Sequence, residues 1–126
     1  MASKGGDRIM ELKNRSQYLD KLISVQDMEV IKVVTGIRRC GKSSLLKLMM
    51  AHLREQGVME EQILSMNFES MQFADMDSKS LYQYVMECAP KGKRLYLFLD
   101  EVQKVRDWQD AVNSFRVDLD CDIYVT

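Results

Sequence analysis

The sequence predicts an α/β fold of three layers, in which a parallel sheet has helices on both of its faces. Short runs of branched and aromatic residues alternate along the chain with segments whose apolar residues recur at helical spacing. One run, LYLFLD at residues 95–100, has no polar alternation, which is typical of a strand buried on both faces. A glycine-rich turn directly follows the first run. This order predicts right-handed crossovers between parallel strands.

The N-terminal part is expected to contain one helix and a link that precede the core of the fold. Residues 1–6 are interpreted as a disordered or non-native tail. Residues 7–30 follow, and within them Asp7 is a suitable N-cap for a helix that runs to about Ser24. A short polar link then leads into the first strand.

Residues 31–126 are expected to form the core of the fold. The predicted strands are 31–35, 62–69, 95–100 and 121–126. The predicted helices are 42–56, 78–88 and a third one marked by Val105, Trp108, Ala111 or Val112, and Phe115. The chain stops inside the last predicted strand, so we expect the core to be incomplete and to belong to a larger protein.

The composition is that of a globular protein with nearly balanced charge. Hydrophobic residues make up 46% of the 126 residues, which suffices for a packed core. The net charge of −1 does not indicate affinity for nucleic acid or for an acidic membrane surface. The three cysteines form no CxxC pair, so they indicate neither a disulfide framework nor a zinc site. Without a signal peptide or a membrane-spanning run, the sequence predicts a cytoplasmic protein.

Residues 36–43 match the Walker A pattern G-x-x-x-x-G-K-[ST], which binds the phosphates of a nucleotide. Gly36 and Gly41 allow the backbone to wrap a polyphosphate in conformations that a Cβ would block. Lys42 supplies a positive charge to the β- and γ-phosphates, and the Ser43 hydroxyl is a ligand for Mg²⁺. The match lies between a predicted strand and a predicted helix, as this chemistry requires. The sequence therefore predicts a site for ATP or ADP with Mg²⁺.

The other residues of the loop are expected to line the same nucleotide site. They are Ile37, Arg38, Arg39, Cys40 and Ser44. Arg38 and Arg39 either contact phosphates or a partner, or face solvent, and we favour the solvent-facing interpretation. One arginine pair in a neutral chain does not indicate a nucleic-acid site. Cys40 is interpreted as a small residue that fills the loop, with a redox role as the alternative.

Two acidic residues end the apolar run LYLFLD and begin the segment after it. Asp100 is expected to hold Mg²⁺, and Glu101 to orient and deprotonate a water that attacks the γ-phosphate. The carboxyl ends of parallel strands meet at one edge of the sheet, where the glycine-rich loop also lies. The alternative is that the pair only caps the following helix. Glu69, at the end of the second strand, is a rival base, and we favour Glu101.

The acidic pair also separates classes of nucleotide-binding protein. DEVQ stands where a GTPase would have D-x-x-G, and no LSGGQ-like signature of transporter ATPases precedes it. A small-molecule kinase usually lacks the tandem D-E. The pair therefore favours an ATPase, with a small-molecule phosphotransferase or a nucleotide-binding interaction module without turnover as the alternatives.

Three segments resemble the AAA-like ATPase domain of a group of prokaryotic P-loop ATP-binding proteins. They are VVTGIRRCGKSSLL, ILSMNFES and LYLFLDEVQKVRDWQDAV. The resemblance implies a P-loop NTPase core with strand order 1-4-3-2. It assigns the phosphate loop to Gly36, Gly41, Lys42 and Ser43, with Ser44 beside it. It makes Asp100 the Mg²⁺ acid and Glu101 the catalytic acid.

The resemblance also implies parts that this chain lacks. Members of the group continue with a γ-phosphate sensor, a fifth strand and arginines that act on the transition state. A winged-helix-like segment and a C-terminal domain of poorly defined function follow, and we expect partner binding there. By itself this chain is expected to hydrolyse ATP slowly or not at all. Strand 31–35 would be an exposed sheet edge, through which the chain is expected to be able to self-associate.

Overall fold

The computed structural model describes residues 18–28, 30–34 and 41–126. The strands are β1 (Lys32–Val33), β2 (Ile63–Asn67), β3 (Leu95–Asp100) and β4 (Cys121–Val125). The α-helices are α2 (Gly41–Glu55), α3 (Ser78–Cys88) and α4 (Trp108–Asp118), and residues 18–24 are also helical. Short 3₁₀ turns lie at Glu60–Gln62, Met71–Phe73 and Val102–Lys104.

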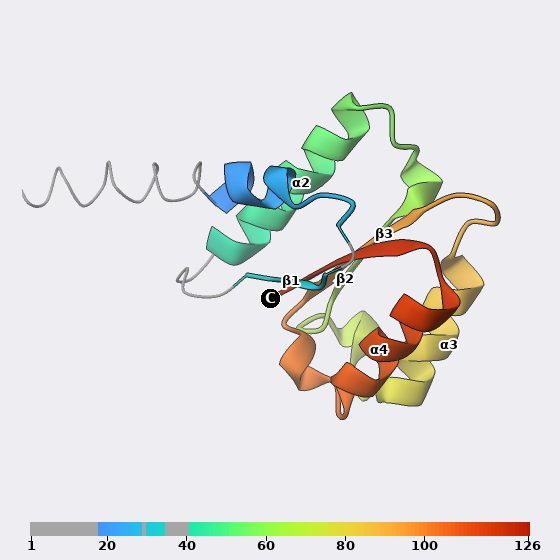
Figure 1. Ribbon diagram of the computed structural model, residues 1–126. Coiled ribbons are helices and arrows are strands. Elements are labelled where there is room, and N and C mark those ends of the chain that lie inside the picture. The colour runs from blue at the N-terminus through green and yellow to red at the C-terminus, as the bar shows by residue number, and fades with distance from the viewer. Residues whose placement is uncertain (1–17, 29, 35–40) are drawn as a thin grey trace, which may run out of the picture.

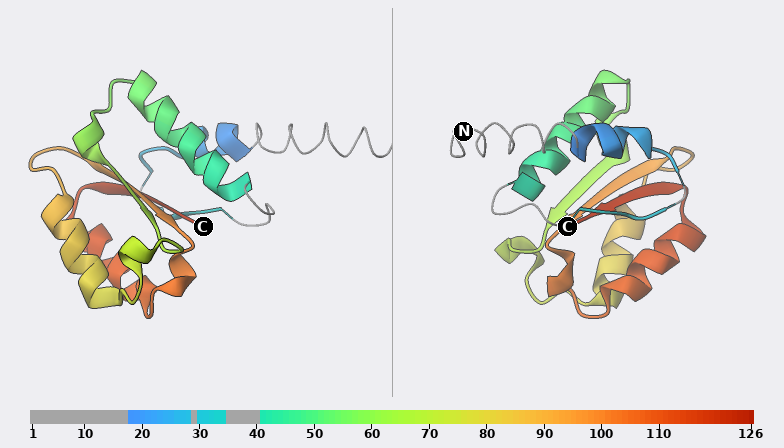
Figure 2. Two further views of the ribbon diagram at one scale, coloured as in Figure 1. Left: turned by 180° about the vertical axis from the view of Figure 1, so that it is seen from behind. Right: turned by 60° about the vertical axis from the view of Figure 1, so that its left-hand side comes forward.

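The strands form one parallel sheet in the order β1-β4-β3-β2, between two layers of helices (Figure 1). Helix α2 and the helical residues 18–24 cover one face, and α3 and α4 cover the other (Figure 2). This arrangement confirms the predicted α/β class and the predicted strand order. Within the described residues, none of the helices has the length and apolar character needed to cross a membrane.

Strand β3 supplies the centre of the hydrophobic core on both faces of the sheet. All of its residues are buried, and successive side chains point to opposite faces. Leu95, Leu97 and Leu99 belong to the apolar cluster under α3 and α4. Tyr96 and Phe98 belong to the cluster under α2, where Phe98 stacks on Tyr124 of β4 with ring centroids 4.7 Å apart. The absence of polar alternation in this run thus follows from burial on two sides.

The main difference from the predicted elements lies before α4. Val105 was expected in this helix, but α4 begins at Trp108. Residues Val102–Lys104 form a 3₁₀ turn, and Asp107 has a left-handed backbone with φ of 57°, which an α-helix does not accommodate. Val105 is nevertheless buried, 2% exposed, so its place in the apolar pattern reflects core packing in a turn.

The other predicted boundaries differ from the structure by a few residues at the ends. Strand β1 covers Lys32–Val33 of the predicted 31–35, and β2 covers Ile63–Asn67 of the predicted 62–69. Most of the predicted N-terminal helix lies outside the described residues, and its final part, 18–24, is helical.

A buried ion pair at the amino ends of the strands holds β1 beside β4. The Lys32 ammonium contacts the Asp122 carboxylate, and their side chains are 2% and 0% exposed. Asp122 also accepts the backbone N–H of Asp27 at 2.9 Å and the hydroxyl of Tyr124 at 2.6 Å. Lys32 donates to the carbonyl of Met28 at 2.7 Å. These bonds compensate the burial of both charges and tie the link before β1 to the sheet.

Replacing Asp122 with Asn is expected to destabilise the fold strongly. The change leaves the Lys32 ammonium buried without a counter-charge, which costs roughly 3 kcal/mol or more of unfolding free energy. Urea denaturation of the variant and the wild type measures the difference. Asp118→Asn is the matched control, since Asp118 is exposed and accepts the Tyr82 hydroxyl at 2.6 Å. Equal losses in the two variants would contradict the role given to the buried pair.

Candidate functional site

The carboxyl ends of β3 and β4 meet the first turn of α2 at one edge of the sheet (Figure 1). Gly41 is the first residue of α2 and is buried, and Lys42, Ser43 and Ser44 follow it. Leu45, Leu46 and Met49 hold this helix against the sheet. Five residues of the predicted phosphate loop lie outside the described residues: Gly36, Ile37, Arg38, Arg39 and Cys40.

The Asp100 carboxylate lies at the centre of this edge. It is the last residue of β3 and is 6% exposed. The Ser43 hydroxyl donates to its Oδ2 at 2.5 Å, and the Thr126 hydroxyl donates to its Oδ1 at 2.5 Å. A buried carboxylate requires such partners, and here each oxygen has one. The predicted phosphate-loop serine and the predicted Mg²⁺ acid are therefore in direct contact.

Glu101 follows β3 directly and has a left-handed backbone, with φ of 59° and ψ of 46°. This conformation costs a residue other than glycine about 1 kcal/mol. The backbone N–H of Glu101 donates to the Thr126 hydroxyl at 2.9 Å. Its carboxylate lies 3.9 Å from the Lys42 ammonium and accepts the Gln103 side-chain amide at 2.5 Å. The Lys42 and Glu101 side chains are 29% and 23% exposed, so both groups reach solvent.

The structure places the rival base, Glu69, in a different setting. Glu69 is exposed, and its backbone N–H donates to the side-chain carbonyl of Asn67 at 2.9 Å. Among the described residues, no hydrogen bond or ion pair joins the Glu69 carboxylate to Lys42, Ser43 or Asp100. Glu101, in contrast, adjoins both the first turn of α2 and Asp100.

Two residues of the site, Thr126 and Gln103, were not among those predicted from the sequence. Thr126 follows β4 directly and bonds to both acidic residues. Gln103 bonds to the Glu101 carboxylate from the next turn. A polar residue at the carboxyl end of an apolar strand was the available signal for Thr126, because the carboxyl ends of parallel strands share one edge.

The oxygen atoms of this site fit Mg²⁺. This cation prefers oxygen ligands and is commonly bound through one or two carboxylates together with substrate phosphates. Ser43 Oγ and Asp100 Oδ2 lie 2.5 Å apart, so both atoms can face one cation. Within the part of the chain that the structure describes, three or more His, Cys, Asp or Glu residues do not gather as a metal cluster.

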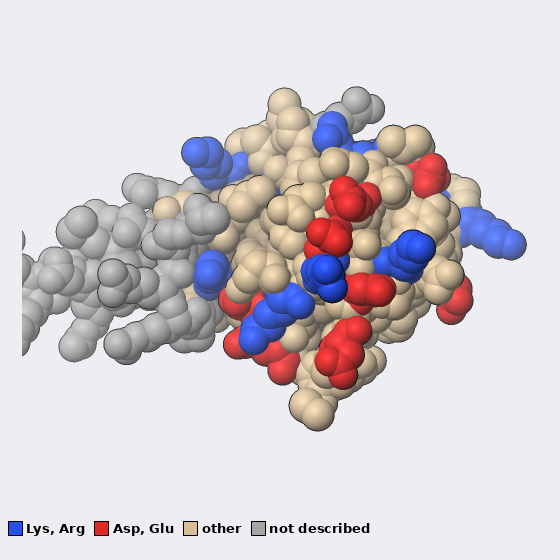
Figure 3. All heavy atoms as spheres, turned by 90° about the horizontal axis from the view of Figure 1, so that it is seen from below, with Lys and Arg blue, Asp and Glu red and all other residues tan. Residues whose placement is uncertain are grey.

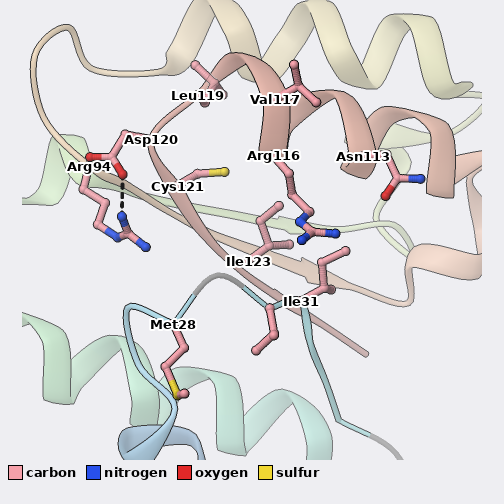
Figure 4. Close-up of a pocket in the computed structure, with 11 residues that line it drawn as sticks. Met28, Ile31, Arg94, Asn113, Arg116, Val117, Leu119, Asp120, Cys121 and Ile123 are labelled. Atoms are coloured by element: carbon pink, nitrogen blue, oxygen red, sulfur yellow. Dashed lines mark hydrogen bonds and ion pairs between the residues drawn. The ribbon is translucent and has the colours of Figure 1, made fainter.

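A groove of about 370 Å³ lies at the opposite edge of the sheet, between α4, the start of β4 and the link before β1 (Figure 4). Its walls combine apolar side chains, such as Ile31 and Ile123, with polar ones, such as Asn113. Arg94 and Asp120 form an ion pair at one end. The residues that line this groove do not include Lys42, Ser43 or Asp100, so the groove is separate from the candidate nucleotide site.

On the face of the molecule seen from below, charged side chains of both signs are mixed (Figure 3). Figure 3 shows acidic and basic side chains side by side over the face seen from below. Binding to nucleic acid usually requires a clustered basic patch. The face shown carries no such patch among the described residues.

The two described cysteines are expected to react with alkylating agents at different rates. Burial raises the pKa of the Cys121 thiol to about 11, whereas Cys88 is exposed. At pH 8 iodoacetamide should therefore label Cys88 and largely spare Cys121, because the thiolate is the nucleophile. Mass spectrometry of peptides from the folded protein measures both sites. In urea both cysteines should react alike; rapid labelling of Cys121 in the folded protein would contradict the assignment.

Comparison with known proteins places this arrangement in a family. A family model described as an AAA domain matches residues 29–126. An uncharacterized protein of Haemophilus influenzae is 39% identical over 115 residues, which cover 90% of this chain and 29% of that protein. The chain thus spans less than a third of the length of this relative. No solved structure matches the chain significantly.

Proposed function

The chain belongs to the AAA domain family, and we propose that it binds ATP with Mg²⁺ and cleaves the γ-phosphate from ATP by hydrolysis. At the level of the family it is a nucleotide-binding protein of the ATPase type. One observation carries the finer proposal: Ser43 at the start of α2 contacts Asp100 at the end of β3, while Lys42 faces Glu101. Two acids, a lysine and a hydroxyl thus meet at the edge where the Walker A pattern leads into its helix.

The first turn of α2 is suited to hold the phosphates. This helix has 15 residues and no acidic residue in its first turn, so its positive end is not neutralised from within. Lys42 supplies a further charge, and Gly36, Ile37, Arg38, Arg39, Cys40 and Gly41 would supply the loop around the phosphates. Ser43 and Asp100 would hold Mg²⁺, which neutralises the charge that develops on the phosphate oxygens.

Glu101 is proposed as the general base. Its carboxylate would take a proton from a water as the water oxygen attacks the γ-phosphorus. The bond between that phosphorus and the bridging oxygen breaks, and ADP leaves with the electron pair. In the structure Lys42 lies 3.9 Å from Glu101, too far for a strong contact. When phosphates attract Lys42, Gln103 remains to orient the carboxylate.

We further propose that this domain supplies ATP binding to a longer protein. The relative from Haemophilus influenzae is more than three times as long as the matched region. Partners would then bind outside the described domain.

Strand β1 is an outer strand of the sheet, with Val33 58% exposed, which supports the expectation that another strand can pair there.

Lys42→Ala is expected to weaken ATP binding by about tenfold or more, because a charged contact to phosphate is lost. Isothermal titration calorimetry with ATP and Mg²⁺ measures the affinity. Lys47→Ala is the matched control, since Lys47 is an exposed lysine in the same helix. Unchanged affinity in the Lys42 variant would rule out the proposed phosphate contact.

Glu101→Gln is expected to keep ATP affinity within about threefold but to lower turnover by roughly 10²-fold or more, because the general base is lost. Phosphate release measures turnover in this chain, or in a longer protein that contains it if this chain is slow. Glu69→Gln tests the rival base and should retain turnover. Loss of turnover in the Glu69 variant alone would reverse the two roles. Normal turnover in both variants would rule out both Glu101 and Glu69 as the general base of hydrolysis.

A further inference from the structure

Thr126 bonds to four consecutive residues at the end of β3. Its backbone N–H donates to the carbonyl of Leu99 at 3.0 Å, and its carbonyl accepts the N–H of Val102 at 3.1 Å. Its hydroxyl donates to Asp100 Oδ1 at 2.5 Å and accepts the N–H of Glu101 at 2.9 Å. The two backbone bonds are open to any residue other than proline, whereas the two hydroxyl bonds require serine or threonine at this position.

The register of the sheet brings the hydroxyl to this place. Leu99 is paired with Val125, so Thr126 stands beside Asp100, one step beyond the ladder. The chain there leaves the strand through the left-handed backbone of Glu101. A hydroxyl has one hydrogen, and because it is donated to Asp100, an oxygen lone pair faces the N–H of Glu101. The Thr126 hydroxyl oxygen therefore links the side chain of Asp100 to the backbone of Glu101.

We propose that Thr126 is a positioning residue that sets the orientation of Asp100 and Glu101 together; its effect on turnover rests on the proposed hydrolysis. With Oδ1 engaged by Thr126, the other oxygen of Asp100 faces Ser43. The bond from the Glu101 N–H holds the turn that directs the Glu101 carboxylate towards Lys42. Without the hydroxyl, Asp100 Oδ1 loses its donor and the Glu101 N–H loses its acceptor, while the bond from Ser43 to Asp100 Oδ2 remains.

Two substitutions separate the hydroxyl from the shape of the side chain. Thr126→Val keeps the branched shape and removes both hydroxyl bonds, whereas Thr126→Ser keeps the hydroxyl. The Val variant should speed hydrogen exchange of the Glu101 amide by about tenfold, because that N–H loses its partner. It should also lower kcat by about tenfold or more, with KM for ATP changed less than about threefold. The Ser variant should remain near the wild type in both measurements.

The amide exchange is followed by NMR on this chain, and kcat by phosphate release with ATP and Mg²⁺. Ser114→Ala is the matched control, because it removes a hydroxyl bond to the carbonyl of Asp110 in α4. The proposal is overturned if the Val variant keeps the wild-type exchange rate at Glu101, or keeps the wild-type kcat in a protein that hydrolyses ATP. It is also overturned if the Ser variant loses as much as the Val variant.

The same experiments distinguish this proposal from the proposed function. If neither this chain nor a longer protein that contains it hydrolyses ATP, the proposed function fails, while the exchange rate at Glu101 still decides whether Thr126 holds the turn. If Glu101→Gln abolishes turnover but Thr126→Val does not change it, the proposed function stands and the positioning role is wrong.

Discussion

The contacts of one buried carboxylate, that of Asp100, connect the elements of the candidate site. A carboxylate that is 6% exposed must find hydrogen-bond donors within the protein. Asp100 finds them in Ser43 at the start of α2 and in Thr126 at the end of β4. The first turn of a helix and the ends of two strands are thereby held within hydrogen-bond distance. The turn at Glu101 therefore begins directly after a residue that is held by two hydrogen bonds.

A second group of buried charges lies at the opposite end of the strands, where β1 and β4 begin. Lys32 and Asp122 neutralise each other at the amino ends of β1 and β4, far along the strands from Asp100. Strand β3 runs from the one end of the sheet to the other and is buried along its whole length. Each end thus has a polar network that specifies which elements meet there, while the apolar centre supplies most of the burial. The Lys32 pair holds the fold, and the Asp100 contacts shape the candidate site.

The sequence predicted most of the fold from local patterns. LYLFLD indicated a buried central strand, and the structure confirms this with all of its residues buried. The resemblance to AAA-like domains supplied the strand order, which the structure also confirms. The start of α4 was predicted wrongly, because Val105 is apolar at helical spacing yet lies in a turn. Periodicity records which side chains are buried and does not record the left-handed residue that interrupts the helix.

By itself, the sequence determined the residue types of the candidate site: Lys42 and Ser43 in a stretch that matches the Walker A pattern, and Asp100 and Glu101 after an apolar strand. Their chemistry follows from side-chain type and short spacing, and both are visible in one dimension. Only the tertiary structure decided that Thr126 joins Asp100 to Glu101, and that Lys32 pairs with Asp122. These contacts depend on which strands are neighbours and in which register. The apolar pattern of each strand limits which side chains can face the core, but which segments become neighbours is decided by packing between parts that are distant in the chain.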